Sequence, residues 1–451
     1  MSTMRLFFWL LTSAFSLSQI PNASFYLEDI EISGQKTLPT SVLLSHCLLE
    51  VGQEVDEVQL SEALNRIRKL PFVYDCHFAL KRGSERGKFL LQIDVIEVRK
   101  FTFGLYAPDG RDILHAQMDP EPFDGSLLGT WRIIQHGKLE FYTTLGLGSR
   151  SRDEFGGGFF SAGFMFYGLT GDRSFSNIEY TIQSGANLED ILNLNSNLGI
   201  EKRLSFSHVL HMVDDHWLTF ELFRADALNQ WSPFLIDSDS GSEPQRESTT
   251  ERLGVNFAWS YNSTDDAWIP NTGTLFHFGF NFLTQDTEYS LPTSWMFTEL
   301  DNTHRLFYLD WKTYNALSSK QTLAFSCGGI NGNSDYNLAE PLPASDRPLK
   351  LIKQSHRDWN VYLGCDYSYK LNRRFWFLND MQCHIGLSLQ AGDMASLDSR
   401  YPGIIPGFHE FQRSVFSVGF SSRNSWGIIR LHIKSIDYWS RDQEVFQEAF
   451  E

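Results

Sequence analysis

Long hydrophobic runs are missing from most of this 451-residue sequence. Beyond the amino-terminal segment, no apolar stretch reaches the roughly 18–20 residues that a membrane-spanning helix requires. A positive charge balance is missing too, because 38 Lys and Arg face 55 Asp and Glu, for a net charge of −17. Surfaces that bind nucleic acid are rich in Lys and Arg. We therefore expect no nucleic acid among the partners.

Cysteine and catalytic motifs are also scarce. The sequence has five cysteines, Cys47, Cys76, Cys327, Cys365 and Cys383. Their odd number and wide spacing fit neither a disulfide framework nor a zinc site, and only Cys47 with Cys76 forms a pair worth testing. No G-x-S-x-G, H-E-x-x-H, CxxC or phosphate-loop pattern occurs. We predict that the protein is not an enzyme, with no catalytic residues, metal or cofactor.

Aromatic residues, in contrast, are abundant. They make up 14% of the chain, with 37 Phe, 16 Tyr and 12 Trp, beside 33 Gly. A chain this aromatic can bury a core, so disorder is excluded. Many aromatic residues among polar and small ones favour strands with one apolar face.

The amino terminus resembles a targeting segment. Arg5 precedes an apolar run, Leu6–Phe15, and Ser16 and Ser18 are small residues before a cleavage point near Gln19. This order is typical of a secretory signal peptide, which we assign to residues 1–18. The alternative is a buried amphipathic helix, although no polar stripe runs through the apolar stretch.

Residues 25–98 have the pattern of a small α+β domain. A strand, Phe25–Ile32, precedes a helix that Pro39 opens and Gly52 closes. Asp56 can cap a second helix, which ends before Pro71. Alternating apolar residues then predict two strands, the second over Leu91, Ile93 and Val95. The expected order is β-α-α-β-β, with both helices on one sheet face.

From residue 100 to 451, short alternating segments replace helical periodicity. In Thr274–Phe282 the phenylalanines fall on one face, while His277 and Asn281 fall on the other. One apolar and one polar face per strand is typical of a transmembrane β-barrel. The length accommodates about 12–16 strands, most simply 16. A soluble β-sandwich is the alternative.

Two parts of the chain resemble a known superfamily. The small domain resembles a POTRA domain, the periplasmic module that precedes certain outer-membrane barrels, at Gly34, Gly52 and the Leu70–Val73 segment. The stretch YNSTDDAWIPNTGTLFHFGF resembles the barrel hairpin of the BamA/TamA outer-membrane assembly superfamily, whose barrels are of the surface-antigen type. The hairpin residues are Asp265, Asp266, Pro270 and Gly273.

The resemblance implies further site residues. An arginine on a lumen loop braces such barrels, and the best positional match is Arg357, although Asp358 stands where the superfamily has glycine. The POTRA-like domain implies a sheet edge that accepts a client strand, which we place at Leu91, Ile93 and Val95. A domain that merely plugs or positions the barrel is the alternative.

The expected function follows from this resemblance. It implies a bacterial outer-membrane protein with its POTRA domain in the periplasm. The protein would take unfolded outer-membrane or exported chains and pass them to the barrel for insertion or translocation. Its partners would be membrane lipid, those clients and periplasmic accessory proteins. A passive channel or a structural surface barrel without insertase activity is the alternative, since the lumen-loop motif and the carboxyl terminus depart from the superfamily pattern.

Overall fold

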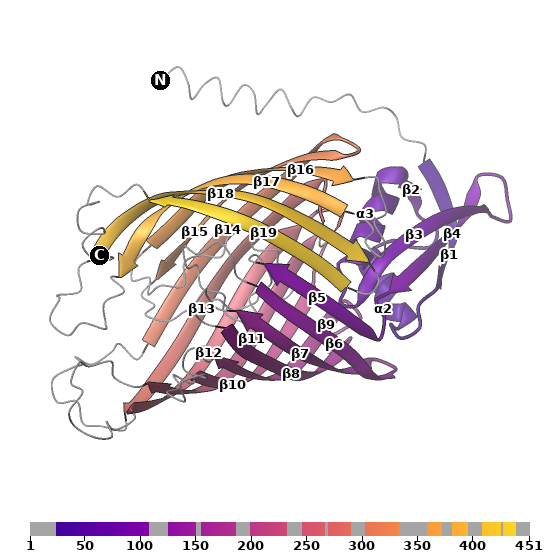
Figure 1. Ribbon diagram of the computed structural model, residues 1–451. Coiled ribbons are helices and arrows are strands. Elements are labelled where there is room, and N and C mark those ends of the chain that lie inside the picture. The colour runs from indigo at the N-terminus through magenta and orange to yellow at the C-terminus, as the bar shows by residue number, and fades with distance from the viewer. Residues whose placement is uncertain are drawn as a thin grey trace, which may run out of the picture.

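The protein consists of a small α+β domain seated at one end of a closed β-barrel (Figure 1). The computed structural model describes residues 24–107, 125–149, 155–185, 199–231, 246–266, 269–289, 303–332, 359–371, 381–395, 408–424 and 427–438. The signal segment predicted at residues 1–18 lies outside this part of the chain.

The small domain follows the predicted order with one addition. Its elements are β1 (Ser24–Ser33), α2 (Thr40–Cys47), β2 (Glu54–Asp56), α3 (Glu57–Arg68), β3 (Val73–Arg82) and β4 (Lys88–Glu97). The added strand is the short β2, which pairs with the beginning of β1. The sheet order is β2-β1-β4-β3, with β1 and β4 parallel. The last strand in sequence, β4, is therefore an interior strand of the sheet.

Local sequence signals set the ends of the two helices. Asp56 caps α3 by accepting from the Gln59 backbone N–H at 2.8 Å, and Gln59 reciprocates in a capping box. Helix α2 ends earlier than predicted, because Leu48 already adopts a left-handed conformation at φ 58°. Gly52, at φ 88°, lies in the turn that follows rather than at the helix end.

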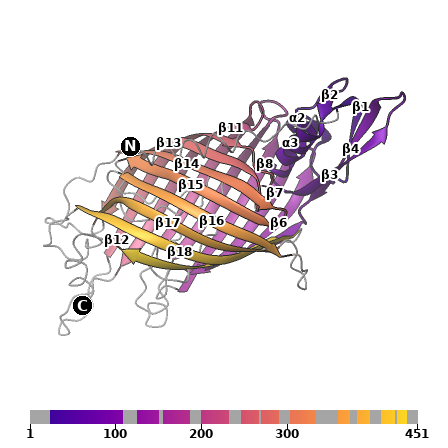
Figure 2. The same cartoon turned by 90° about the horizontal axis from the view of Figure 1, so that it is seen from above.

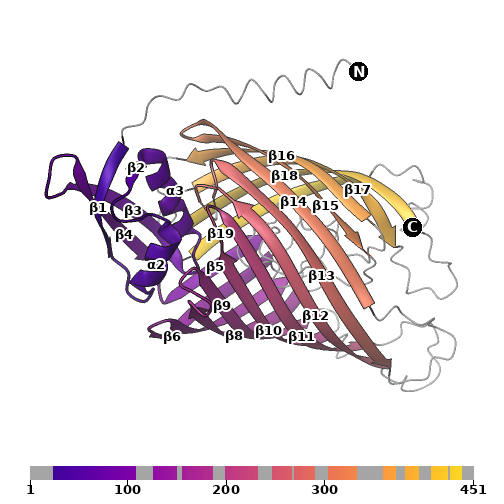
Figure 3. The ribbon, with the colours of Figure 1, turned by 180° about the vertical axis from the view of Figure 1, so that it is seen from behind.

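The helices form the layer that faces the barrel, and the sheet lies on their far side (Figure 3). The core between these layers is apolar and fully enclosed. Its largest side chains come from both layers: Leu27, Leu43, Leu60, Ile67, Leu91 and Ile93.

The barrel of the described residues has fifteen strands, within the predicted range and one fewer than the sixteen expected. They are β5 (Phe101–Ala107), β6 (Gly125–His136), β7 (Leu139–Ser149), β8 (Phe155–Tyr167), β9 (Ser174–Gly185), β10 (Gly199–His211), β11 (His216–Trp231), β12 (Arg246–Asn262), β13 (Gly273–Tyr289), β14 (Thr303–Ser318), β15 (Gln321–Gly332), β16 (Trp359–Leu371), β17 (Met381–Ala395), β18 (Phe408–Asn424) and β19 (Gly427–Tyr438). Each strand pairs antiparallel with its sequence neighbour, as β14 to β18 show in Figure 2. Strand β19 closes the ring on β5 (Figure 1).

The alternation predicted along the strands separates an outer from an inner surface. On β13, Phe278 is 43% exposed, whereas His277 and Asn281 are buried. The same division recurs on β14, where Phe307 and Leu309 are exposed. A soluble sandwich buries its apolar faces, whereas this barrel turns them outward, as a lipid-facing surface requires. The structure therefore confirms a transmembrane barrel and contradicts the sandwich alternative.

Glycine on the inner surface makes room for aromatic rings. The Tyr308 ring lies over Gly279, its directly paired residue on β13. A Cβ atom built on Gly279 would lie 2.1 Å from Tyr308 Cζ. The ring therefore fills the space that any side chain at residue 279 would need.

The connections at the end that carries the small domain are short. Residues 137–138 join β6 to β7, residues 212–215 join β10 to β11, and residues 319–320 join β14 to β15. Because β5 directly follows β4, these connections lie beside the small domain. Among the described residues, the structure contains no helix that is long and apolar enough to cross a membrane.

Candidate functional site

The small domain and the barrel share one apolar core at their junction. Tyr142, Tyr167 and Trp217 of the barrel belong to the same buried cluster as the core of the small domain. The Phe72 ring contacts Tyr142 edge-on, with 5.9 Å between ring centroids. This continuous burial holds the domain against the barrel in one position.

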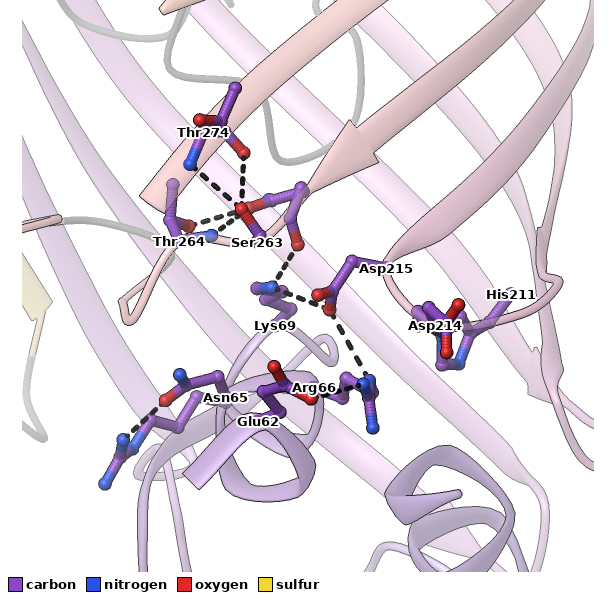
Figure 4. Close-up of polar contacts among 12 residues, drawn as sticks. Glu62, Asn65, Arg66, Lys69, His211, Asp214, Asp215, Ser263, Thr264 and Thr274 are labelled. Carbon is purple, nitrogen blue, oxygen red and sulfur yellow. Dashed lines mark hydrogen bonds and ion pairs between the residues drawn. The ribbon is translucent and has the colours of Figure 1, made fainter. Parts of the chain in front are cut away.

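Two basic residues, Arg66 of α3 and Lys69 directly after this helix, reach into the barrel mouth (Figure 4). The Asp215 carboxylate lies 3.5 Å from Arg66 Nε and 3.3 Å from Lys69 Nζ. Lys69 also donates to the backbone carbonyl of Asn262. Burial lowers the pKa of Lys69 to about 8, although Asp215 opposes the shift. Nothing local in the sequence reveals these partners of Lys69, which lie 146 and 193 residues away.

A second buried contact joins His46 of α2 to His211 at the end of β10. Their Nδ1 atoms lie 2.9 Å apart, and both side chains are buried. The two rings are stacked with a centroid distance of 4.9 Å, and Trp217 stacks on His211 at 4.2 Å. No spacing rule in the sequence pairs these histidines.

A third polar contact surrounds Arg132 on β6. Its guanidinium binds the Glu140 carboxylate, donates to the Val98 carbonyl at 3.1 Å and lies 4.4 Å from the centre of the Phe72 ring. It also lies 3.7 Å from the carboxylate of Glu97. Arg132 thereby fixes the short link between β4 and the first barrel strand.

Glu97 itself ties the loop before α2 to the end of β4. Its Oε1 accepts the backbone N–H groups of Lys36, Thr37 and Leu38, each at 2.9 Å. Burial acts to raise the pKa of Glu97, but these hydrogen bonds outweigh it, so that the pKa lies below its ordinary value. The carboxylate is therefore ionised where it faces Arg132.

The predicted hairpin residues lie at the same end of the barrel. Asp265 accepts the backbone N–H groups of Asn271 at 2.8 Å and Thr272 at 3.1 Å, and Asp266 accepts that of Ile269 at 3.0 Å. Pro270 lies between these donors, in the β12–β13 connection. Gly273 has φ 103°, and a Cβ there would lie 2.4 Å from the Ser263 carbonyl oxygen. Only glycine fits this backbone without strain.

Asp266 has a second contact that the sequence did not reveal. Arg423, near the end of β18, binds its two carboxylate oxygens at 3.1 and 3.0 Å and donates to the Val73 carbonyl at 3.3 Å. The Arg423 side chain therefore connects the end of β18, the β12–β13 hairpin and the small domain.

Arg357, the predicted lumen brace, lies outside the described residues, and its role stays a prediction.

The structure contradicts the predicted client-docking strand. Leu91, Ile93 and Val95 lie on β4, which pairs with β1 on one side and β3 on the other. Their side chains are each 1% exposed. The prediction assumed that the last strand of the domain would be an edge, but the parallel β1–β4 pairing places it inside the sheet.

The most unusual pairing in the barrel is its seam, defined as the contact between β5 and β19. These strands run parallel, and only Phe103–Ala107 pair with Gly427–Leu431. The β5–β6 ladder is also short, from Phe101 to Tyr106, whereas β11 pairs with β12 along sixteen residues. In the described part of the chain, β19 beyond Leu431 pairs with β18 alone.

Parity explains the parallel seam. A ring of strands that alternate in direction closes antiparallel only if the number of strands is even. With fifteen strands, one neighbouring pair must run in the same direction. Parallel pairing is slightly less stable per residue than antiparallel pairing. Among the described residues, the seam therefore combines the weaker type of pairing with the shortest ladder of the barrel.

Among known proteins, the fold of this chain is similar to several solved structures. No protein-family model matches the sequence, and no curated protein matches it. BamA from Haemophilus ducreyi lacking POTRA domains 1–3 is similar over 92% of this chain and 85% of its own, with 9% identity and a TM-score of 0.44. CdiB from Escherichia coli covers 92% of this chain and 76% of its own, with 13% identity and a TM-score of 0.45. CdiB from Acinetobacter baumannii covers 92% and 74%, with 11% identity and a TM-score of 0.46.

Proposed function

We propose that this protein is an outer-membrane factor for protein assembly or translocation, and that the seam is its working part. The observation that carries the proposal is the seam of five parallel residue pairs between the first and last described strands. Among the described residues, opening the five-pair seam breaks fewer backbone hydrogen bonds than opening the sixteen-residue ladder between β11 and β12.

Residues 432–438 of β19 give an incoming chain a template in this proposal. Residues 432–438 pair on one side with β18, and no described strand covers their other side. Unpaired backbone groups are costly in the hydrocarbon layer, so a client strand that pairs there gains hydrogen bonds. Burying the apolar face of the client in lipid is itself favourable. The reaction needs no nucleotide or cofactor.

In this proposal the small domain is periplasmic and orients the barrel mouth for clients delivered from that side. Its helices contact the barrel. The edges of its sheet are β3 on one side and β2 on the other, whereas β4 lies inside the sheet. Unfolded outer-membrane or exported chains, with periplasmic accessory proteins that carry them, are the proposed partners.

The junction favours a second function, a structural barrel or passive channel. The continuous apolar core and the buried Lys69–Asp215 pair fix the small domain against the barrel. A fixed domain suits a barrel that stays closed. Such a barrel would give a stable conductance or none, and would leave client assembly unchanged.

The experiment uses the purified full chain in liposomes, with protease-protected folding of an unfolded outer-membrane barrel as the readout. The seam is locked by Leu105→Cys with Ile429→Cys, which are direct register partners. Directly paired residues have the Cα separation that a disulfide requires. The matched control is Leu145→Cys with Phe160→Cys, which links β7 to β8. In both variants Cys327, Cys365 and Cys383 are replaced by serine.

We expect the wild type to accelerate client folding over empty liposomes. The oxidised seam variant should lose this acceleration and regain it on reduction, whereas the oxidised control should keep it. Full activity with a locked seam would refute the seam as the working part. No acceleration by a folded wild-type barrel would refute the assembly function and favour the channel or structural barrel.

A further inference from the structure

The buried histidine pair at the junction has a defined proton arrangement. His46 and His211 are 0% and 1% exposed, and their Nδ1 atoms lie 2.9 Å apart. His211 Nε2 lies 2.6 Å from the Asp214 backbone carbonyl. Because a carbonyl oxygen only accepts, Nε2 of His211 carries a hydrogen, and in the neutral ring its Nδ1 is then the acceptor.

The rest of the arrangement follows from these two contacts. His46 must donate from Nδ1 to His211, so its own Nε2 carries no hydrogen. That His46 Nε2 atom is buried and has no hydrogen-bond partner within the described part of the chain. Two neutral rings account for these contacts, and His46 Nε2 is the one nitrogen of the pair without a partner among the described residues.

Adding a proton to either ring conflicts with this packing. A proton on His211 Nδ1 would place two N–H donors opposite each other. A proton on His46 Nε2 would create a buried charge that no acceptor in the described part of the protein faces. The charged groups that act on the pair are Arg66 of α3, Arg173 of the β8–β9 turn and Asp215 of the β10–β11 turn. Two of these three are positive, which further disfavours a protonated ring.

We propose that the His46–His211 pair is a proton-sensitive lock, which holds the small domain against the barrel at neutral pH and releases it on acidification. The lock joins α2 of the small domain to the end of β10 in the barrel. Protonation of the pair therefore acts on the contact between the domain and the barrel. The proposal goes beyond the assembly function and does not depend on it.

The direction and size of the effect follow from linkage. Burial, with His211 and Arg173, lowers the pKa of His46 to about 3 in the docked protein. A solvent-exposed histidine in the undocked domain has a pKa of about 6.5. Below pH 6.5 the undocked state binds more protons, so docking weakens as pH falls from 6.5 towards 3. At pH 5 the single residue His46 changes the docking equilibrium about 30-fold.

Hydrogen–deuterium exchange of the full chain in detergent micelles tests the lock. Exchange is compared at pH 7.5 and pH 5.0, after correction for the intrinsic pH dependence of amide exchange. In the wild type we expect peptides that cover α2 and residues 211–216 to lose protection at pH 5.0. Peptides from β4, inside the small domain, should keep theirs, because undocking leaves that sheet intact.

His46→Asn separates the proton effect from simple packing. The asparagine amide can donate to His211 Nδ1 as His46 does, and after a flip it can accept from a protonated His211. We expect docking at pH 7.5 and a loss of protection at pH 5.0 at least tenfold smaller than in the wild type. His46→Phe with His211→Phe, which keeps the ring stack on Trp217, is the second variant should the first not dock.

His208→Gln is the matched control. His208 lies on the same strand but binds the barrel residues Thr170 and Ser176 and not His46, so the wild-type pH response should remain. Unchanged protection of the wild-type junction at pH 5.0 would overturn the lock. A docked His46→Asn or double-phenylalanine variant that opens as the wild type does would overturn it as well.

Discussion

Arg423 of β18 and Asp266 of the β12–β13 hairpin form an ion pair across the barrel mouth, with four strands, β14 to β17, between them around the ring. Arg423 also donates to the Val73 carbonyl of the small domain. The pair therefore links two distant parts of the barrel rim and the domain seated on it.

Arg423→Met should destabilise the small domain, because it removes a hydrogen bond to Val73 and leaves Asp266 without this guanidinium. The Arg423 side chain is only 8% exposed, so we expect a loss of about 1–3 kcal/mol. The measurement is urea unfolding of the domain, followed by labelling of its buried thiols Cys47 and Cys76 in a background with the three barrel cysteines replaced by serine.

The control for this ion pair is Arg224→Met. Arg224 pairs with Glu251 on the barrel, but both side chains are more than half exposed. Exposed ion pairs contribute less than about 1 kcal/mol. Equal urea midpoints for the Arg423 and Arg224 variants would contradict the bracing role.

Lys69 should make docking stronger at alkaline pH. Its pKa is about 8 when docked and 10.5 ordinarily. Between these values the undocked state binds more protons, so docking strengthens as pH rises from 8 to 10.5. The free energy of unfolding of the domain, measured by urea titration, should therefore rise from pH 7.5 to pH 9.5, by less than the roughly 3 kcal/mol that the full shift allows.

Lys69→Met should abolish this rise, because methionine does not titrate. Lys138→Met, which removes the half-exposed partner of Asp172, should retain it. A rise of the same size in the Lys69→Met variant would assign the alkaline response to another group.

Gly279→Ala should destabilise the barrel, because the new methyl group would meet the Tyr308 ring. Overpacking of this kind costs about 1–3 kcal/mol. Gly364→Ala is the control, since its Cβ would meet only the hydroxyl oxygen of Ser326, which can rotate away. Urea titration of barrel fluorescence in micelles measures both. Tyr308→Ser should remove most of the effect of Gly279→Ala; additive losses would contradict the packing explanation.

Arg357→Ala tests the lumen brace that the sequence resemblance implies. If Arg357 pairs with acidic residues of the barrel interior, the variant should lower the melting temperature of the barrel or the rate of client insertion in liposomes. Wild-type values in both assays would remove this assignment.

Local patterns determined much of this protein. The two-residue alternation of Phe276–Phe282 identifies a strand and its lipid-facing side, because successive side chains in a strand point to opposite faces. Asp56 marks the start of α3, and the Asp265–Gly273 turn marks a hairpin, because caps and turns are formed by residues a few positions apart. Each of these features is contained within one short segment.

Only the tertiary structure decided which distant segments meet. The position of β4 inside its sheet depends on the parallel pairing with β1, some sixty residues earlier. The parallel seam follows from the number of strands that close the ring. Lys69, His46 and Arg423 become functional candidates because their partners lie 146, 165 and 157 residues away in sequence. Such contacts form by chain closure and shared burial, which no local residue pattern encodes.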